Sequence, residues 1–131
     1  MRRWLSLLVC LSALVVASGA AAGRSPLTGI YQAKIKGSAP QLNGTWLINI
    51  IANGTYAVAK EPDTNTLLIG GTSAISGKTI VFTDKAGPLA CKVTGKYSWS
   101  LVGKKLKLTK VKDTCSGRVA VLSSAPYTKV S

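Results

Sequence analysis

Apolar and polar residues alternate with a period of two through most of the chain after residue 30. Tyr31, Ala33 and Ile35 alternate with polar residues, and the same pattern returns along 42–50 and 79–83. Gly, Asn, Asp and Pro interrupt the pattern at short and regular intervals. Such alternation is typical of half-buried β-strands, because an amphipathic helix would repeat about every 3.6 residues. The pattern therefore predicts eight or so short strands and no helix.

Turn residues separate the predicted strands. Asn53-Gly54 predicts a tight hairpin because both residues tolerate positive φ, and Gly70-Gly71 predicts a bulge or bend within an extended segment. Since no helix is expected between them, neighbouring strands should pair antiparallel, which leaves a closed up-and-down barrel and a sandwich as alternatives. The expected extended segments are 31–35, 42–50, 56–58, 67–76, 79–83, 91–101 and 106–108, and 119–122 and 127–130 supply the last one or two strands.

The clearest predicted strand is Cys91–Leu101, which alternates over its whole length. Gly103 then turns the chain into a second strand. Two turn positions keep apolar residues opposite each other: Trp99 faces Leu106 in one register and Leu108 in the other. Both registers remain open from the sequence.

Residues 1–22 have the three-part pattern of a secretory signal peptide. A basic start is followed by an almost wholly apolar run over Trp4–Ala17 and by an Ala-x-Ala signal before Gly23. The alternative is a membrane anchor, but the apolar run is shorter than the roughly 20 residues that span a bilayer. We therefore expect a signal peptide over 1–22, a single domain over 23–131 and a secreted, periplasmic or extracellular protein.

Removal of residues 1–22 would also remove Cys10 and leave an even pair, Cys91 and Cys115. Exported chains with two cysteines most simply carry one disulfide. Either register of the hairpin at Gly103 brings these two cysteines within one residue of each other across the ladder. The sequence therefore predicts a Cys91–Cys115 disulfide that closes the open end of the hairpin.

The composition excludes several kinds of catalytic and metal site but does not identify a function. The 131 residues include 17 Lys and Arg, 4 Asp and Glu and no His, for a net charge of +13. Without His there is no Ser-His-Asp triad and no His-ligated metal. The four acidic residues are expected in scattered loops, which leaves few carboxylates for paired acid–base catalysis or for calcium. We expect a binding protein rather than an enzyme, with no cofactor and no metal.

Gly44-Thr45-Trp46 resembles the Gly-x-Trp signature near the start of the lipocalin barrel. The segments 95–101, 106–109 and 113–118 are similar to the ending of small exported bacterial lipocalin-like proteins. The resemblance implies an all-β fold, a small antiparallel up-and-down barrel of about eight strands over 23–131. It also implies that Trp46 closes one end of the barrel and that Arg118 packs over its ring.

The family's usual role implies a small hydrophobic ligand in the barrel. An eight-stranded barrel is wide enough to hold one small ligand or to be filled by its own side chains, so both outcomes remain open. The aromatic residues that would line the interior are Tyr31, Trp46, Tyr56, Phe82, Tyr97 and Trp99.

A dense run of lysines accompanies the last predicted hairpin. It predicts either a solvated β-surface or a site for an anionic surface or acidic protein. Nucleic acid is not expected, because the nearby aromatic residues should face inward rather than stack on bases. The lysines concerned are Lys92, Lys96, Lys104, Lys105, Lys107, Lys110 and Lys112.

A protein-binding module is the alternative from another functional class. Its sharpest form is a secreted protease inhibitor, because small exported barrels with one disulfide occur among such inhibitors. In that case Gly23–Thr28, which contains Pro26, would act as a protruding N-terminal segment.

Overall fold

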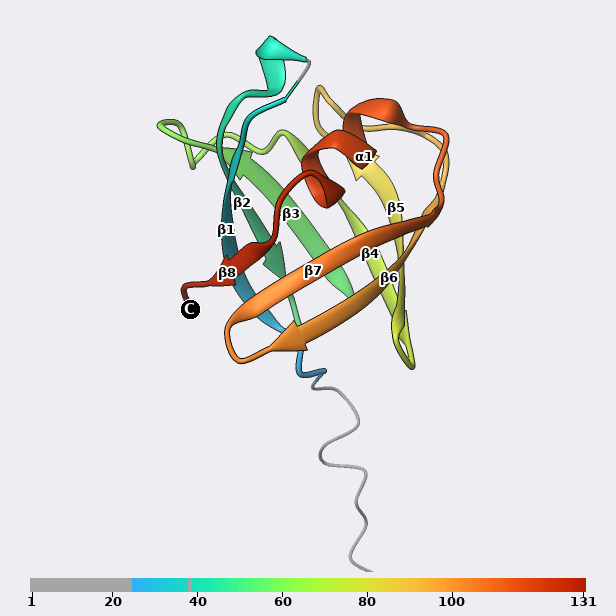
Figure 1. Ribbon diagram of the computed structural model, residues 1–131. Coiled ribbons are helices and arrows are strands. Elements are labelled where there is room, and N and C mark those ends of the chain that lie inside the picture. Colours follow the sequence, from blue (N-terminus) through green and yellow to red (C-terminus); the bar gives the residue numbers. More distant parts are fainter. Residues whose placement is uncertain (1–24, 38) are drawn as a thin grey trace, which may run out of the picture.

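Eight antiparallel strands form a closed barrel in the computed structural model, which describes residues 25–37 and 39–131 (Figure 1). Each strand pairs with its neighbours in sequence, and β8 closes the ring onto β1. This confirms the predicted up-and-down barrel and excludes the sandwich, whereas the predicted signal peptide lies outside the described residues. The elements are β1 (Gly29–Ile35), the 3-10 turn η2 (Pro40–Leu42), β2 (Gly44–Ile50), β3 (Thr55–Lys60), β4 (Ile69–Ser76), β5 (Thr79–Ala86), β6 (Gly95–Val102), β7 (Lys105–Lys112), α1 (Ser116–Ser123) and β8 (Tyr127–Lys129).

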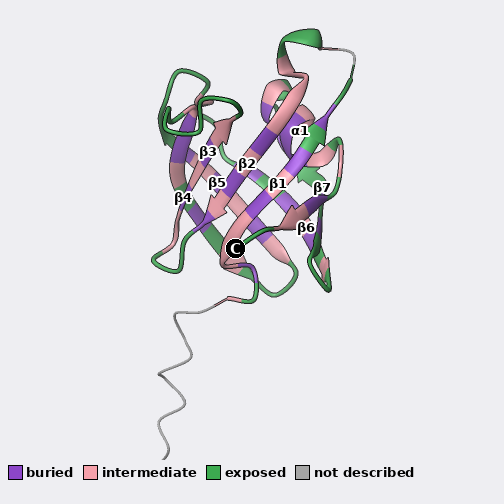
Figure 2. Ribbon diagram, turned by 90° about the vertical axis from the view of Figure 1, so that its left-hand side faces the viewer, coloured by how far each residue is buried: buried purple, intermediate pink, exposed green. Residues whose placement is uncertain are grey.

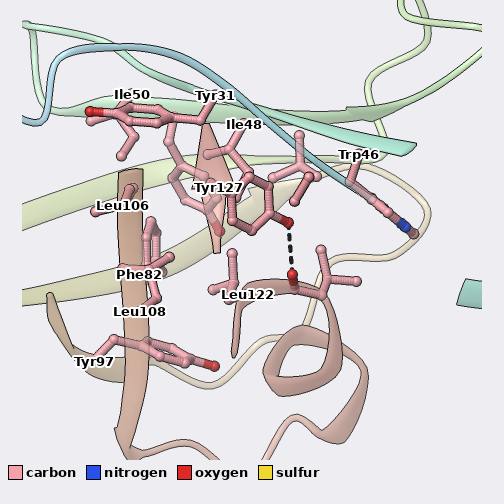
Figure 3. Close-up of a cluster of buried hydrophobic side chains, with 14 of the residues drawn as sticks. Tyr31, Trp46, Ile48, Ile50, Phe82, Tyr97, Leu106, Leu108, Leu122 and Tyr127 are labelled. Carbon is pink, nitrogen blue, oxygen red and sulfur yellow. Dashed lines mark hydrogen bonds between the residues drawn. The ribbon is translucent and has the colours of Figure 1, made fainter. Parts of the chain in front are cut away.

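The period-two alternation places one face of each strand inside the barrel. Buried and partly exposed residues alternate along the strands, while most turns and loops are exposed (Figure 2). The interior is filled by side chains rather than hollow along its length, as the rings of Tyr31, Phe82, Tyr97 and Tyr127 show (Figure 3). Phe82 packs edge-on against two tyrosines, with its centroid 4.8 Å from Tyr56 and 5.8 Å from Tyr97.

The barrel has two ends of different construction. The hairpin end carries the three short turns β2–β3, β4–β5 and β6–β7. The loop end carries η2, α1 and the longer loops 61–68 and 87–94. We use these two names below.

The turns at the hairpin end lie where the sequence predicts them. Gly103 has a φ of 60°, a backbone conformation that residues other than glycine rarely adopt. The β6–β7 register pairs Trp99 with Leu108, which settles the open alternative. At the β2–β3 turn Gly54 has positive φ but Asn53 does not; Asn53 Oδ1 instead accepts the Thr55 N–H at 3.0 Å.

The bulge predicted at Gly70-Gly71 is present, because the β4–β5 register shifts between these two residues. A second register shift, between Lys96 and Tyr97, was not predicted.

The prediction that 119–122 forms a strand is wrong, and so is the prediction that the chain has no helix. This segment belongs to α1, whose buried residues Arg118, Val121 and Leu122 are spaced as one face of a helix. A short apolar run fits either structure, so periodicity alone could not decide. No helix in the described part of the chain is long and apolar enough to span a membrane.

The strand predicted over 91–101 begins only at Gly95. The backbone before it bonds to side chains instead of to a neighbouring strand. The Cys91 N–H donates to Asp84 Oδ2 at 2.8 Å, and the Val93 carbonyl accepts from Arg118 Nη2 at 2.7 Å. Val93, which was expected to face inward, is exposed.

Candidate functional site

A buried ion cluster lies between the barrel wall and α1. Arg118 Nε and Nη2 donate to Asp113 Oδ2 and Oδ1 at 2.7 and 2.8 Å, a two-point contact of guanidinium with carboxylate. Its third nitrogen, Nη1, lies 3.2 Å from Asp84 Oδ2. The side chains of all three residues are almost wholly buried. A single arginine therefore joins the end of β7 to β5 and to the loop before β6.

Two tyrosines reach the same carboxylates from the barrel interior. The Tyr97 hydroxyl donates to Asp113 Oδ2 at 2.5 Å, and the Tyr56 hydroxyl donates to Asp84 Oδ1. Tyr56 and Asp84 lie in one transverse row, with Gly71 of β4 between them.

Two glycines leave room for this cluster. A Cβ at Gly71 would collide with the backbone of β5 at Thr83, and a Cβ at Gly95 would collide with the Asp113 carboxylate. The cluster thus depends on two positions that lack a side chain as well as on the charged groups.

The disulfide secures both carboxylates at once. Cys91 and Cys115 are bonded, as predicted, with their Cα atoms 6.2 Å apart. The Cys91 N–H donates to Asp84, and the Cys115 N–H donates to Asp113 Oδ1 at 2.9 Å. The β6–β7 ladder was predicted to extend to the two cysteines, but it ends before them, and the disulfide joins the loop before β6 to the residue before α1.

Hydrogen bonding fixes the charges of the cluster. Burial alone would raise the pKa of Asp113, but bonds from Arg118, Tyr97 and the Cys115 N–H hold that pKa below its ordinary value of 3.8. Burial lowers the pKa of Arg118, and the two aspartates more than restore it. Burial and the bond to Asp113 raise the pKa of Tyr97. At neutral pH Asp113 and Arg118 are therefore charged and Tyr97 is neutral.

A cavity of about 350 Å³ lies at the loop end, beside the ion cluster. Most of its wall is apolar, and the Cys91–Cys115 disulfide and the first turn of α1 complete it. Leu89 on the 87–94 loop lines it while being 45% exposed, so it lies where a ligand could cover it. The lining residues are Leu42, Trp46, Ile69, Leu89, Cys91, Thr114, Cys115, Ser116, Gly117, Arg118 and Val121.

Trp46 and Arg118 both line this cavity. The Trp46 indole is 1% exposed and its N–H donates to the Leu42 carbonyl at 2.7 Å. The cation over its ring is Lys60, whose Nζ lies 5.5 Å from the centroid. The Arg118 guanidinium is held by the two aspartates. The structure thus brings the predicted barrel-closing pair to the same end of the barrel, and assigns the cation over the indole to Lys60.

The six predicted interior aromatics are all buried, but they have different roles. Trp46 lines the cavity, whereas Tyr56 and Tyr97 bond to the ion cluster. Tyr31 and Phe82 fill the core, and Tyr31 O–H donates to the Leu27 carbonyl at 2.9 Å. Trp99 lies under the Lys78 ammonium group, 4.2 Å from the ring centroid.

Sequence reasoning missed most of the cavity wall and the ion cluster beside it. It expected all four acidic residues in loops, but Asp84 lies in β5 and is buried, and Asp113 is buried directly after β7. The sequence signal that could have indicated the cluster was the presence of Arg118, Asp84 and Asp113 in a chain whose other charged residues are mostly lysines. In the described residues no three His, Cys, Asp or Glu side chains group as a metal site would require.

A second cavity, of about 360 Å³, lies on the outer face of β1–β3 under the loop 64–67. Its floor includes Ile30, Leu47 and Ala57. It is separate from the ion cluster and from the predicted interior aromatics.

The N-terminal segment does not protrude where it is described. Gly23 and Arg24 lie outside the described residues, but Ser25–Thr28 forms a turn against the hairpin end. Leu27 in that turn is 0% exposed. The expectation of a protruding segment over Gly23–Thr28 is therefore wrong for its described part, because Leu27 is part of the core.

Comparisons of the chain with protein-family models, with curated proteins and with solved structures gave no match. The lipocalin-like resemblance therefore stays a prediction that rests on the residues named above. What the structure itself establishes is the closed barrel, the disulfide and the arrangement of the loop end.

Proposed function

We propose that the protein is an exported binding protein that takes one small apolar molecule into the cavity at the loop end. The observation that carries this proposal is the cavity itself, about 350 Å³ in volume and walled mainly by apolar side chains. Ligand sites in proteins range over roughly 300–1,000 Å³ and are mostly apolar, with a few polar groups that orient the ligand. The volume favours a molecule at the small end of that range.

The two sides of the cavity wall are built differently. The disulfide, the ion cluster and the buried indole of Trp46 form the inner side. Exposed Leu89 on the 87–94 loop and half-buried Leu42 at the end of η2 lie at the outer side. A ligand that covered Leu89 would remove apolar surface from water, which supplies the driving force for binding.

The two tryptophans of the barrel provide a built-in test. Trp46 lines the cavity and Trp99 does not. In the exported chain, the neutral fluorophore phenylnaphthylamine should bind and quench Trp46. The Trp99→Phe variant should keep most of that quenching, and the Trp46→Phe variant should lose most of it.

A cavity-filling variant tests the site directly. Gly117 lines the cavity, and a Cβ built there meets no atom within 4 Å, so Gly117→Leu should fit and occupy the space. Gly37 has equally open surroundings but lies outside the cavity wall, so Gly37→Leu is the matched control. We expect Gly117→Leu to abolish phenylnaphthylamine binding and Gly37→Leu to preserve it. Equal binding by both variants would show that the molecule binds elsewhere.

A further inference from the structure

We propose a second binding surface, independent of the cavity: the outer face of the β6–β7 hairpin docks on an anionic lipid surface. This lysine face comprises Lys96, Val102, Lys104, Lys105, Lys107 and Val111, all exposed. The alternation of β6 and β7 turns these strand residues outward, since Tyr97, Trp99, Leu106 and Leu108 between them are buried. Exposed Lys112, which pairs with Lys96, continues the face, and Ser98, Ser100 and Thr109 also point outward.

The charge of this face is not balanced by neighbouring carboxylates. Asp84 and Asp113 are buried and engaged with Arg118, so they contribute little outside the barrel. The exposed acidic side chains of the described part are Glu61 and Asp63, which follow β3. In a ring of eight strands β3 lies opposite β7. The molecule therefore has a cationic side and a far side that carries its exposed carboxylates, which would orient it toward an anionic surface.

Exposed valines favour a lipid surface over a soluble polyanion. Val102 is 76% exposed and Val111 54%, the two largest fractions among the exposed large hydrophobic residues described. Both stand among the lysines of this face. Apolar side chains gain free energy at the boundary between headgroups and acyl chains, but not on a hydrated polyanion. The absence of aromatic and arginine side chains from the face also disfavours nucleic acid.

Vesicle sedimentation tests the proposal with the protein that an exporting host secretes. Vesicles of equimolar phosphatidylcholine and phosphatidylglycerol should bind the protein, and rising salt should weaken that binding because it screens exposed charges. Vesicles of phosphatidylcholine alone should bind far less. Equal binding to both vesicle types would overturn the proposal, and the charge variants below separate this face from any contribution of residues 1–22.

Matched charge variants locate the surface. Lys104→Ser with Lys107→Ser should weaken binding to the anionic vesicles by about tenfold or more. Lys36→Ser with Lys85→Ser removes the same charge from exposed positions outside β6–β8 and should cost much less. Equal losses in the two double variants would mean that net charge, and not this face, binds the vesicles.

The valines separate a lipid surface from a soluble polyanion. Val102→Ser with Val111→Ser should weaken binding to the anionic vesicles several-fold and leave binding to inorganic polyphosphate unchanged. Thermal unfolding of each of the three double variants should match the parent chain, since all six substituted side chains are exposed. If the valine variant binds the vesicles as tightly as the parent, the lipid proposal fails and a soluble polyanion is the partner.

Discussion

The hairpin end and the loop end close the same barrel by different means. At the hairpin end, short turns join consecutive strands, and the apolar residues Leu27, Ile50 and Leu106 next to them are almost fully buried. At the loop end, the side chains of Asp84 in β5, Asp113 directly after β7 and Arg118 in α1 meet backbone groups of the 87–94 loop in the ion cluster. The hairpin end therefore depends on local contacts, and the loop end on contacts between distant parts of the sequence.

The two tryptophans show the same contrast. Trp46 at the loop end is held by a hydrogen bond from its indole N–H to Leu42. The Trp99 indole nitrogen is buried and has no hydrogen-bond partner among the described residues. Trp99 is held by packing and by Lys78, whose carbonyl accepts the Trp99 backbone N–H at 2.9 Å. The indole next to the cavity therefore has a hydrogen bond of its own, whereas the indole of Trp99 depends on packing and on the Lys78 cation.

This difference has a consequence for binding. A closed apolar core leaves no space for a ligand, as the filled interior below the cavity shows. Long loops fixed by a disulfide and by buried charges can enclose space without collapsing into it. The loop end is thus the part of this barrel where a cavity and a stable wall coexist.

Loss of the arginine should have the largest effect and should act on the loop end. Arg118→Leu leaves two buried carboxylates without their cation, and we expect a loss of about 3–5 kcal/mol in the free energy of unfolding. Lys92→Leu, an exposed cation on the 87–94 loop, should change it by less than about 0.5 kcal/mol. Urea denaturation measures both.

Hydrogen exchange decides where the arginine acts. In Arg118→Lys, which keeps a charge but not the two-point contact, the amides of Cys91 and Cys115 should exchange faster. The Ile51 amide at the hairpin end, which donates to the Thr55 carbonyl, should change much less. A uniform change at both ends would mean that the ends are not separate units of stability.

The same division explains what could be predicted from the sequence. Alternation, Gly103 and Asn53-Gly54 are local signals, and most of the strands, their antiparallel pairing and the turns at the hairpin end followed from them, whereas they left the choice between barrel and sandwich open. The cluster depends on Tyr56 reaching Asp84 across Gly71, three residues that are adjacent only after β3, β4 and β5 have paired. No periodicity encodes such a contact.

The two misassigned segments have the same cause. Residues 91–94 look like a strand because their apolar residues fit a period of two, and 119–122 because they are a short apolar run. Arg118 bonds to the carbonyl of Val93 and lies one residue before 119–122, so a tertiary contact decides the conformation of both segments. Local propensity was overridden where the cluster formed.

Acid should weaken the loop end through Asp113. Its pKa is lowered in the folded protein, so the unfolded chain binds a proton more readily and stability is lost as pH falls below about 5. Tyr97→Phe removes a donor to this carboxylate, which should raise the pKa of Asp113 toward its value in the unfolded chain. The stability of this variant should therefore fall less steeply as the pH is lowered. Urea denaturation repeated across an acid titration measures the slope.

Tyr127→Phe is the control for that titration. It removes a buried hydroxyl of the same kind, but this one donates to the Val121 carbonyl at 2.7 Å and not to Asp113 (Figure 3). Each variant should lose about 1–2 kcal/mol at neutral pH. The stability of Tyr127→Phe should fall in acid as steeply as that of the parent chain, and an equally reduced slope in both variants would remove Asp113 from the explanation.

The smallest expected effect compares the cations over the two tryptophans. Lys78 lies 4.2 Å from the Trp99 ring centroid and Lys60 lies 5.5 Å from that of Trp46. Lys78→Met keeps an apolar stem but removes the charge, and should cost about 0.5–1 kcal/mol at this exposed site. Lys60→Met should cost less because its cation is farther away and Trp46 keeps its hydrogen bond to Leu42. Lys85→Met controls for the lost charge. If Lys60→Met were the more damaging variant in urea denaturation, the loop end would depend on its cation as well as on its hydrogen bonds, and the contrast between the two tryptophans would fail.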